Sequence, residues 1–344
     1  MKKYLTFIDM FAGIGGFRSG MEQAGHKCVG WIEWDKFARQ SYQAMYNTEG
    51  EFNGKDIQQV RGSDLPDSDV WCFGFPCQDV SVSGKQAGLL NGKRSGLFFE
   101  VIRLLQERIR NKETLPKTLF IENVKNLLSV DGGWGFARMQ IELDQAGYDI
   151  EWSVINSAEV VPQNRERVYI IGHLRGASPS KVFPIIRKSQ ENSSGTPVKI
   201  HQVGQLNKTE SFGGNPQVGR VYGTDGLSPT LNTMQGGGRE PKILVRACLT
   251  PDRINKRQQG RRFKDNGEPS FTLNTVDRHG VLIENQKEWA IRKLTPRECW
   301  RLQGFTDEQF DKAKDVGVSN SHLYKQAGNS VTVPVIKAIA EKFT

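Results

Sequence analysis

The sequence predicts an α/β protein: a parallel, doubly wound sheet followed by a smaller, loop-rich region. Two observations predict this arrangement. Up to about residue 172, short apolar runs typical of buried strands alternate with stretches of helical periodicity. From there to about residue 290 the chain is rich in Gly, Pro, Ser, Asn and Arg and has few helical stretches. A chain of 344 residues is long enough for one large domain and a smaller one.

Short apolar runs predict the strands, and apolar residues at helical spacing predict the helices. We expect strands at residues 5–8, 29–32, 70–73, 118–121, 151–155 and 168–172. We expect helices at residues 17–24, 36–46, 97–110, 136–146, 295–302, 307–313 and 333–342. We therefore predict a first domain of residues 1–172 plus about 320–344, a second domain of residues 173–290, and a bridging segment of residues 291–319.

The net charge of +9 is concentrated in the second region. Residues 173–290 hold 18 Lys and Arg against 10 Asp and Glu, whereas the rest of the chain holds 29 against 28. A nearly neutral body that carries a basic segment indicates a polyanionic partner, with a basic but solvated surface as the alternative.

The distribution of cysteines and apolar residues favours a cytoplasmic protein. The absence of a CxxC pair argues against a disulfide framework or a zinc site, so we predict no metal. Residues 1–9 are typical of a first strand rather than a signal peptide, and no apolar run approaches the length of a membrane span. The cysteines are Cys28, Cys72, Cys77, Cys248 and Cys299.

The second region contains a near-repeat. The run Ser-Pro-Thr-Leu-Asn-Thr at residues 228–233 recurs as Ser-Phe-Thr-Leu-Asn-Thr at residues 270–275. Two copies are too few for a solenoid, so a duplicated strand-and-loop unit and a chance recurrence both stay open.

A glycine-rich loop, residues 11–17, lies between the first predicted strand and the first predicted helix. Glycines there allow a ligand to approach the backbone closely, and a helix N-terminus favours negative charge. The loop lacks the full GxGxxG spacing, which makes a dehydrogenase a poor fit. It is consistent with a cofactor loop or with a tight turn.

Acidic residues follow the next two turns. The second strand ends at Glu33-Trp34-Asp35, where an acid in this kind of fold typically binds ribose hydroxyls and an aromatic ring offers a flat face. Asp56 follows the third turn. Together these loops fit a cofactor that contains a nucleoside, although any single acid is more often a helix cap.

Candidate catalytic residues follow the later strands. Cys77, in Gly-Phe-Pro-Cys-Gln, is placed at the carboxyl end of a strand, where α/β sheets position their chemistry and a thiol can act as a nucleophile. Glu122 ends the next strand, where a carboxyl in a closed cleft can serve as an acid. Arg165 and Arg167 share one face of a later strand and could bind a carbonyl or phosphate. The alternatives are a packed thiol, a turn carboxylate and arginines that pair with Glu166.

These features in this order closely resemble the DNA (cytosine-5) methyltransferase family. The resemblance covers nearly the whole chain, apart from parts of residues 173–290. Pro-Cys-Gln, Glu-Asn-Val and Gln-x-Arg-x-Arg in this order and spacing are specific together. The matching motifs are residues 11–17, 33–35, 54–57, 74–78, 95–98, 122–124, 163–167, 292–298, 302–305 and 326–331.

The resemblance implies a Rossmann-like domain that transfers a methyl group from S-adenosylmethionine to carbon 5 of cytosine and releases S-adenosylhomocysteine. Cys77 would add to carbon 6, and Glu122 would bond the ring's N3 and exocyclic amine. Arg165 would hold the O2 carbonyl, and Arg167 would support the loop and the acid. Residues expected to line the cofactor are Phe11, Gly13, Ile14, Gly15, Gly16, Glu33, Trp34, Asp56, Ile57, Pro76, Leu97, Asn329 and Ser330.

The resemblance also implies a mostly β target-recognition domain and a base flipped out of double-stranded DNA. A loop at residues 80–95 would close over that base, and Gln217 would fill the space it leaves. The expected DNA contacts are Ser83, Lys85, Gln217, Arg220, Tyr222, Thr230 and Leu231. Residues 240–285 depart from the compact pattern, and we hypothesise that they add DNA contacts.

The sequence therefore predicts a monomeric enzyme of bacterial or phage type that modifies a short DNA sequence. A cognate restriction endonuclease that acts independently is a candidate partner, and no membrane is expected. Two alternatives remain: an RNA (tRNA) cytosine-5 methyltransferase, and a catalytically silent DNA-binding homologue.

Overall fold

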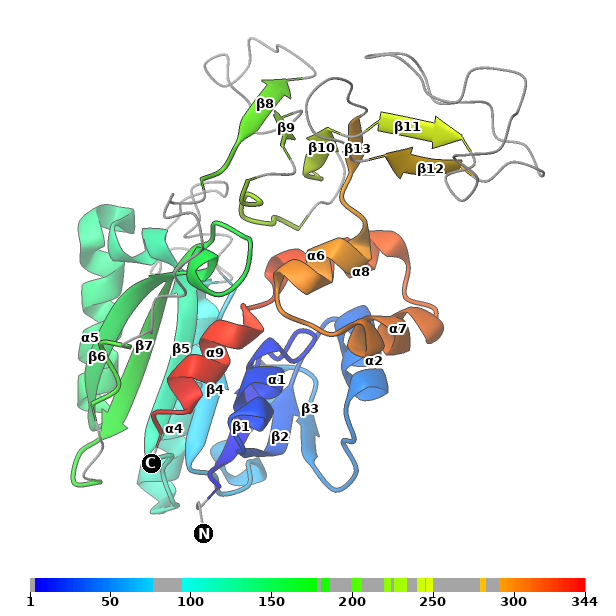
Figure 1. The fold of residues 1–344 in the computed structure, drawn as a ribbon. Helices are drawn as coiled ribbons and strands as arrows, with labels where there is room; N and C mark the ends of the chain where they lie inside the picture. Colours follow the sequence, from blue (N-terminus) through cyan, green and yellow to red (C-terminus); the bar gives the residue numbers. More distant parts are fainter. Residues whose placement is uncertain are drawn as a thin grey trace.

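The structure is a computed structural model that describes residues 4–76, 95–177, 181–185, 199–205, 220–223, 226–233, 240–244, 246–249, 279–282 and 291–343 (Figure 1). Among the helices in these ranges, none is both long and apolar enough to cross a membrane.

A seven-stranded sheet forms the body of the protein, in the order β3-β2-β1-β4-β5-β7-β6. Its strands are β1 (Thr6–Met10), β2 (Lys27–Ile32), β3 (Phe52–Gly54), β4 (Val70–Phe73), β5 (Thr118–Val124), β6 (Tyr148–Asn156) and β7 (Glu166–Leu174). The α/β class is confirmed, and each predicted strand is present within a few residues of its expected bounds. The three-residue β3 was not predicted, because so short a run carries no periodicity.

The prediction of a wholly parallel sheet is wrong at one strand. β7 lies between β5 and β6 and pairs antiparallel with both, whereas the pairs from β3 to β5 are parallel. Only residues 157–165 connect β6 to β7. A parallel crossover needs a dozen or more residues, so this connection can only be a hairpin.

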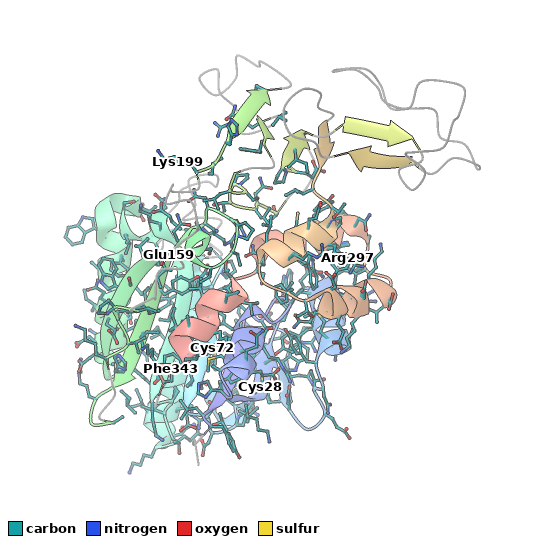
Figure 2. All side chains as sticks on the ribbon, in the orientation of Figure 1. Cys28, Cys72, Glu159, Lys199, Arg297 and Phe343 are labelled. Carbon is teal, nitrogen blue, oxygen red and sulfur yellow. The ribbon has the colours of Figure 1, made fainter. Side chains whose placement is uncertain are left out.

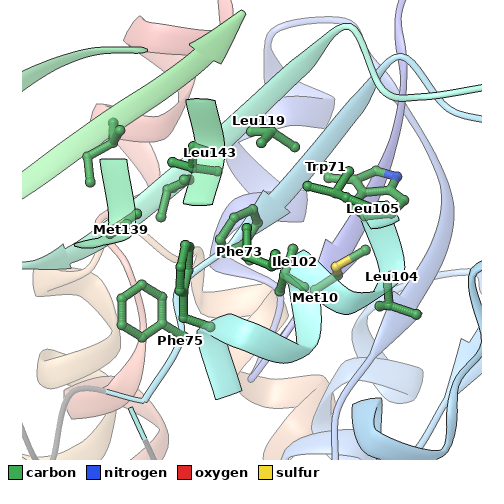
Figure 3. Close-up of a cluster of buried hydrophobic side chains, with 14 of the residues drawn as sticks. Met10, Trp71, Phe73, Phe75, Ile102, Leu104, Leu105, Leu119, Met139 and Leu143 are labelled. Carbon is green, nitrogen blue, oxygen red and sulfur yellow. The ribbon is translucent and has the colours of Figure 1, made fainter. Parts of the chain in front are cut away.

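Helices cover both faces of the sheet. On one face α4 (Phe98–Asn111) and α5 (Trp134–Gln145) bury apolar side chains against the strands. Figure 3 shows this cluster, in which Ile102 and Leu105 of α4 and Met139 of α5 meet Met10, Phe73 and Leu119 of the strands. On the other face α1 (Gly16–Gln23) and α9 (Val333–Ala340) pack together and against the sheet.

The remaining helices lie at the side of the sheet. They are α2 (Lys36–Met45), α6 (Pro296–Leu302), α7 (Asp307–Asp315) and α8 (Asn320–Asn329). The last three form a separate apolar cluster around the buried Trp300. Each predicted helix is present, whereas α8 was missed. Short 3-10 turns are η1 (Ile57–Gln59), η2 (Gly62–Asp64), η3 (Ser95–Leu97), η4 (Lys125–Leu128), η5 (Val130–Gly133) and η6 (Ser157–Glu159).

The regular elements within the described parts of the second region are strands. β8 (Gln202–Gln205), β9 (Arg220–Tyr222), β10 (Lys242–Leu244) and β13 (Ile291–Lys293) form a sheet in the order β13-β10-β9-β8. β11 (Arg246–Leu249) and β12 (His279–Leu282) pair separately. Figure 1 shows both sheets above the edge of the large sheet where α6 and α8 lie. Before them, Val182 and Phe183 pack in the cluster of α1 and α9. The predicted domain bounds stay predictions.

Candidate active site

The predicted catalytic and cofactor residues that the structure describes converge at one edge of the large sheet. β1, β2, β4 and β5 run parallel, so the loops that follow them open at the same edge. β7 runs the other way and begins there, since Arg167 is paired with Val124 at the end of β5. In Figure 2, Glu159 marks this edge in the loop between β6 and β7, while Cys28 and Cys72 lie within the body of the sheet.

The loop after β1 turns sharply toward α1. Phe11, Gly13 and Gly15 adopt left-handed backbone conformations. The Ala12 N–H donates to the Ile32 carbonyl, which ties this loop to the end of β2. At Gly16 a Cβ would lie 2.6 Å from Ser330 Oγ and 2.7 Å from Val331 Cγ2, so any larger residue would have to displace these side chains. The glycine loop therefore meets Ser330, one of the residues near the C-terminus that is predicted to line the cofactor.

Glu33 is held by the backbone on both sides. Its Oε2 accepts from the Gly13 N–H at 2.8 Å and its Oε1 from the Asp35 N–H at 2.7 Å. Burial raises the pKa of this carboxyl, although the two backbone bonds act in the opposite direction. A carboxylate has about four acceptor positions, so capacity remains for hydroxyl donors of a ligand.

The neighbours of Glu33 differ in exposure. Trp34 is 74% exposed, which leaves its ring open to stacking. Asp35 caps α2 and pairs with Lys325 at 2.7 Å; against the effect of burial, this partner lowers the pKa of Asp35. Asp56 caps η1 through the Gln58 N–H, and Ile57 is buried in the cluster of α4 and α5. Leu97 is partly buried against the same cluster.

The turn after β4 is fixed to the end of β5. Asn123, itself buried, donates from Nδ2 to the Phe75 carbonyl at 3.1 Å. A Cβ at Gly74 would lie 3.3 Å from Glu122 Oε2. Pro76 is half-buried, and Cys77 lies outside the described residues. The last described residues of the Pro-Cys motif thus lie beside Glu122. Sequence reasoning missed Asn123, although it is the middle residue of a motif that was singled out.

Glu122 is a buried acid with a cationic neighbour. Its Oε1 lies 3.2 Å from Arg167 Nε, and both side chains are largely buried. Burial raises the pKa of Glu122, while the charges of Arg167 and Arg165 oppose that shift. A carboxyl whose pKa is raised by burial holds its proton to higher pH than a solvated carboxyl does, which suits a general acid.

Arg165 is buried and binds backbone carbonyls. Its Nη1 donates to Leu231 at 3.2 Å, and its Nη2 donates to Gly328 at 3.3 Å and to Ser330 at 2.8 Å. The residue thereby joins the segment around Leu231 to the end of α8. The predicted contact of Arg165 with a base carbonyl stays a prediction, and Arg167 is the arginine that contacts Glu122.

The described cysteines are unsuited to act as nucleophiles. Cys28, Cys72 and Cys299 are buried. Burial raises the thiol pKa to about 12 for Cys28 and for Cys299, and raises it strongly for Cys72. These thiols stay protonated near neutral pH, where a nucleophile needs the thiolate.

The predicted DNA contacts are described only in part. Ser83, Lys85 and Gln217 lie outside the described residues. Arg220 begins β9 and Tyr222 ends it, largely buried. Thr230 is exposed and its hydroxyl donates to the Asn164 carbonyl, whereas Leu231 is buried. Within the described part of the chain, no group of His, Cys, Asp and Glu residues could hold a metal ion.

The family described as C-5 cytosine-specific DNA methylase matches residues 5–344. The orphan methyltransferase M.SPBetaI of Bacillus phage SPbeta is 34% identical over 98% of this chain and 97% of that protein. The type II methyltransferase M.Bsp6I of Bacillus sp. (strain RFL6) is 34% identical over 98% of both chains. The type II methyltransferase M.HhaI of Haemophilus parahaemolyticus is 31% identical over 98% of this chain and 93% of its own.

Solved structures share the fold. The Entamoeba histolytica methyltransferase EhMeth superposes with a TM-score of 0.64 at 20% identity, covering 99% of this chain and 98% of its own. The S. pombe Dnmt2 methyltransferase gives a TM-score of 0.63 at 18% identity, covering 98% and 96%. At these identities the likeness concerns the fold.

Proposed function

The chain belongs to the family of C-5 cytosine-specific DNA methylases, and from that premise we propose that it methylates a cytosine flipped out of a short, specific sequence of duplex DNA through a covalent Cys77 adduct. Family membership makes it an S-adenosylmethionine-dependent enzyme that transfers a methyl group to carbon 5 of cytosine. The flipped base, the adduct and the roles of single residues are the proposal.

One observation carries the choice of Cys77. The bond from Asn123 to the Phe75 carbonyl holds the start of the Pro-Cys motif beside Glu122. Phe75 lies two positions before Cys77 in the sequence, so this turn leads directly into the proposed nucleophile. The buried thiols of Cys28, Cys72 and Cys299 offer no comparable nucleophile.

The proposed reaction assigns each side chain one task. The Cys77 thiolate forms a bond to carbon 6, and protonated Glu122 donates to N3, which draws electrons into the ring and makes carbon 5 nucleophilic. When bound, S-adenosylmethionine would supply an electrophilic methyl group to carbon 5, and its sulfonium S–CH3 bond would break to leave S-adenosylhomocysteine. Loss of the proton from carbon 5 to solvent then expels the Cys77 thiolate, and return of the N3 proton to the Glu122 carboxylate restores the neutral aromatic ring.

The arginines would stabilise the charge that develops on the base. We keep Arg165 as the predicted partner of the O2 carbonyl, although three backbone carbonyls already accept from its guanidinium. Because Arg167 lies against Glu122, it is the second candidate for that carbonyl. Variants of the two arginines would separate these roles.

The residues around the glycine loop fit the nucleoside part of the cofactor. Glu33 retains acceptor positions for ribose hydroxyls, and the exposed Trp34 offers a stacking face for adenine. Asp56 would accept from the exocyclic amine. The other predicted lining residues, Phe11, Gly13, Ile14, Gly15, Gly16, Ile57, Pro76, Leu97, Asn329 and Ser330, belong to this proposal.

The DNA would lie between the large sheet and the smaller β region. Ser83, Lys85, Gln217, Arg220, Tyr222, Thr230 and Leu231 are the proposed contact or ordering residues. Thr230 would have to release the Asn164 carbonyl to donate to a phosphate. We further propose a monomer in the cytoplasm, acting with or without a separate restriction endonuclease.

Methylation mapping tests the proposal. Wild-type protein and Cys77→Ser are incubated with unmethylated duplex DNA and S-adenosylmethionine, followed by sequencing that reports 5-methylcytosine. Cytosine methylation at one short motif, absent with Cys77→Ser, is the expected result. Cys28→Ser is the matched control, because a serine there can still donate to the Gly30 carbonyl. Methylation of tRNA but not DNA, or of neither by a folded protein that binds cofactor, would overturn it.

A further inference from the structure

Gln163 joins two distant segments through one buried amide. The residue is fully buried. Its Oε1 accepts from the Leu231 N–H at 3.0 Å, and its Nε2 donates to the Leu302 carbonyl at 2.9 Å. Leu231 lies in the predicted recognition region and Leu302 ends α6, so this side chain couples the region that would hold DNA to the C-terminal helices.

The segment that Gln163 binds is attached along its length. Residues 228–233, which we call the docking segment, run beside the loop between β6 and β7. The Ser228 N–H donates to the Pro162 carbonyl and the Asn164 N–H donates to the Ser228 carbonyl, each at 2.8 Å. Arg165 adds a bond to the Leu231 carbonyl. The first copy of the Thr-Leu-Asn-Thr repeat is therefore fixed to the large sheet.

The C-terminal side of the docking segment meets α8 at backbone distance. A Cβ at Gly328 would lie 2.0 Å from the Asn232 carbonyl oxygen. This contact places two main chains against each other, which only glycine permits. Ser330, two residues further on, lies against Gly16 of the glycine loop. The docking segment is thus held by the loop between β6 and β7 and by the end of α8, and the chain after α8 contacts the predicted cofactor loop.

We propose that Gln163 is a positioning residue that sets where the recognition region docks over the active site. The first Thr-Leu-Asn-Thr copy then acts as the docking element through its backbone. The inference rests on the proposed function, because a misplaced recognition region matters only if that region presents DNA to the sheet edge. Gln163 acts through Leu231 and touches neither cofactor nor base.

The test uses the chemistry of the amide. In Gln163→Glu an ionised carboxylate still accepts from Leu231 but opposes the Leu302 carbonyl, whereas the protonated acid restores both bonds. The expected result at about pH 8.5 is a rise of at least tenfold in KM for duplex DNA, with the Kd for S-adenosylhomocysteine within about twofold of wild type. As pH falls to about 6, the ratio of variant to wild-type KM should return toward one.

Two further variants keep the test decisive. Gln163→Met keeps the volume of the side chain but makes neither bond. Its KM for duplex DNA should therefore stay raised at low pH as well as at high pH. Gln303→Glu is the matched control, since Gln303 is also fully buried, donates to the Ala327 carbonyl at 2.7 Å and accepts from Thr332 at 3.2 Å, and neither of these bonds involves the docking segment. The Gln303→Glu control should lower Tm, and its KM for DNA should not rise more than its Kd for S-adenosylhomocysteine.

Two results would overturn the inference. One is a Gln163→Glu protein whose KM for DNA matches wild type at the higher pH. The other is a Gln163→Glu protein in which cofactor affinity and DNA methylation both fall, and fall by the same factors as in Gln303→Glu. A wild-type protein that binds cofactor and methylates no duplex DNA would instead remove the proposed function, so the two failures are distinguishable.

Discussion

Asn123 Nδ2 donates a hydrogen bond of 3.1 Å to the carbonyl oxygen of Phe75, two residues before Cys77. The residue is buried, and its Oδ1 accepts from the following backbone N–H of Val124. The amide is therefore held by its own strand while it holds the neighbouring turn. The acid at residue 122 and the turn that leads to the predicted nucleophile are linked through this one side chain.

Removing the donor at residue 123 should slow methylation. In Asn123→Asp a carboxylate oxygen faces the Phe75 carbonyl, so the turn is repelled rather than held. We expect single-turnover methylation to slow by about tenfold or more, with cofactor affinity unchanged. Asn111→Asp, at an exposed helix end, is the control. A rate equal to wild type would show that the bond does not position Cys77.

Replacing Glu122 by Gln should lower kcat by about 10²-fold or more, because the variant cannot donate a proton to the ring. Burial raises the pKa of Glu122, and the reaction needs the protonated form. The wild-type rate should therefore fall as pH rises through that raised pKa. The Gln variant should lack this alkaline fall, and pH profiles of both proteins at saturating substrates provide the measurement.

Asp9 should lower the free energy of unfolding as the pH rises above the ordinary pKa of an aspartate. It is fully buried in β1, and burial raises its pKa well above the ordinary value, with the charge of Arg18 opposing the shift. The folded state then holds a proton that the unfolded chain releases, so the free energy of unfolding falls as pH rises from the unfolded pKa to the folded pKa. A tenfold difference in proton affinity between the two states corresponds to about 1.4 kcal/mol of that free energy.

Asp9→Asn should therefore raise Tm, and the gain over wild type should grow with pH. Thermal melts between about pH 5 and about pH 8 measure it. A gain that stays constant over that range, or a loss that grows, would contradict a protonated Asp9.

Gly16→Ala should weaken cofactor binding and lower stability. The new methyl group would meet Ser330 Oγ at 2.6 Å and Val331 Cγ2 at 2.7 Å, and it would separate α1 from the start of α9. Overpacking of this kind typically costs about 1–3 kcal/mol. Calorimetric titration with S-adenosylhomocysteine and a thermal melt would measure the two effects. Val331→Ala in the same chain should recover part of the lost Tm, since it removes one of the clashing atoms.

Local pattern predicted much of the fold. The alternation of apolar runs and helical periodicity predicted each strand of the large sheet except β3 and each helix except α8. β3 has three residues, and α8 contains a glycine near its end and begins without a side-chain cap, so neither gave a periodic signal. The direction of β7 was predicted wrongly, because periodicity gives an element's type and leaves its direction open.

The order of motifs in the sequence by itself determined the family, the reaction class and the set of residues to consider. The tertiary structure decided which of those residues meet. Asn123 and Phe75 are 48 positions apart, Gln163 and Leu231 are 68 apart, and Gln163 and Leu302 are 139 apart. Short-range periodicity reports which face of an element is buried, but it carries no information on sheet order. Contacts at such separations exist only once seven strands have taken their order and the C-terminal helices have packed beside them.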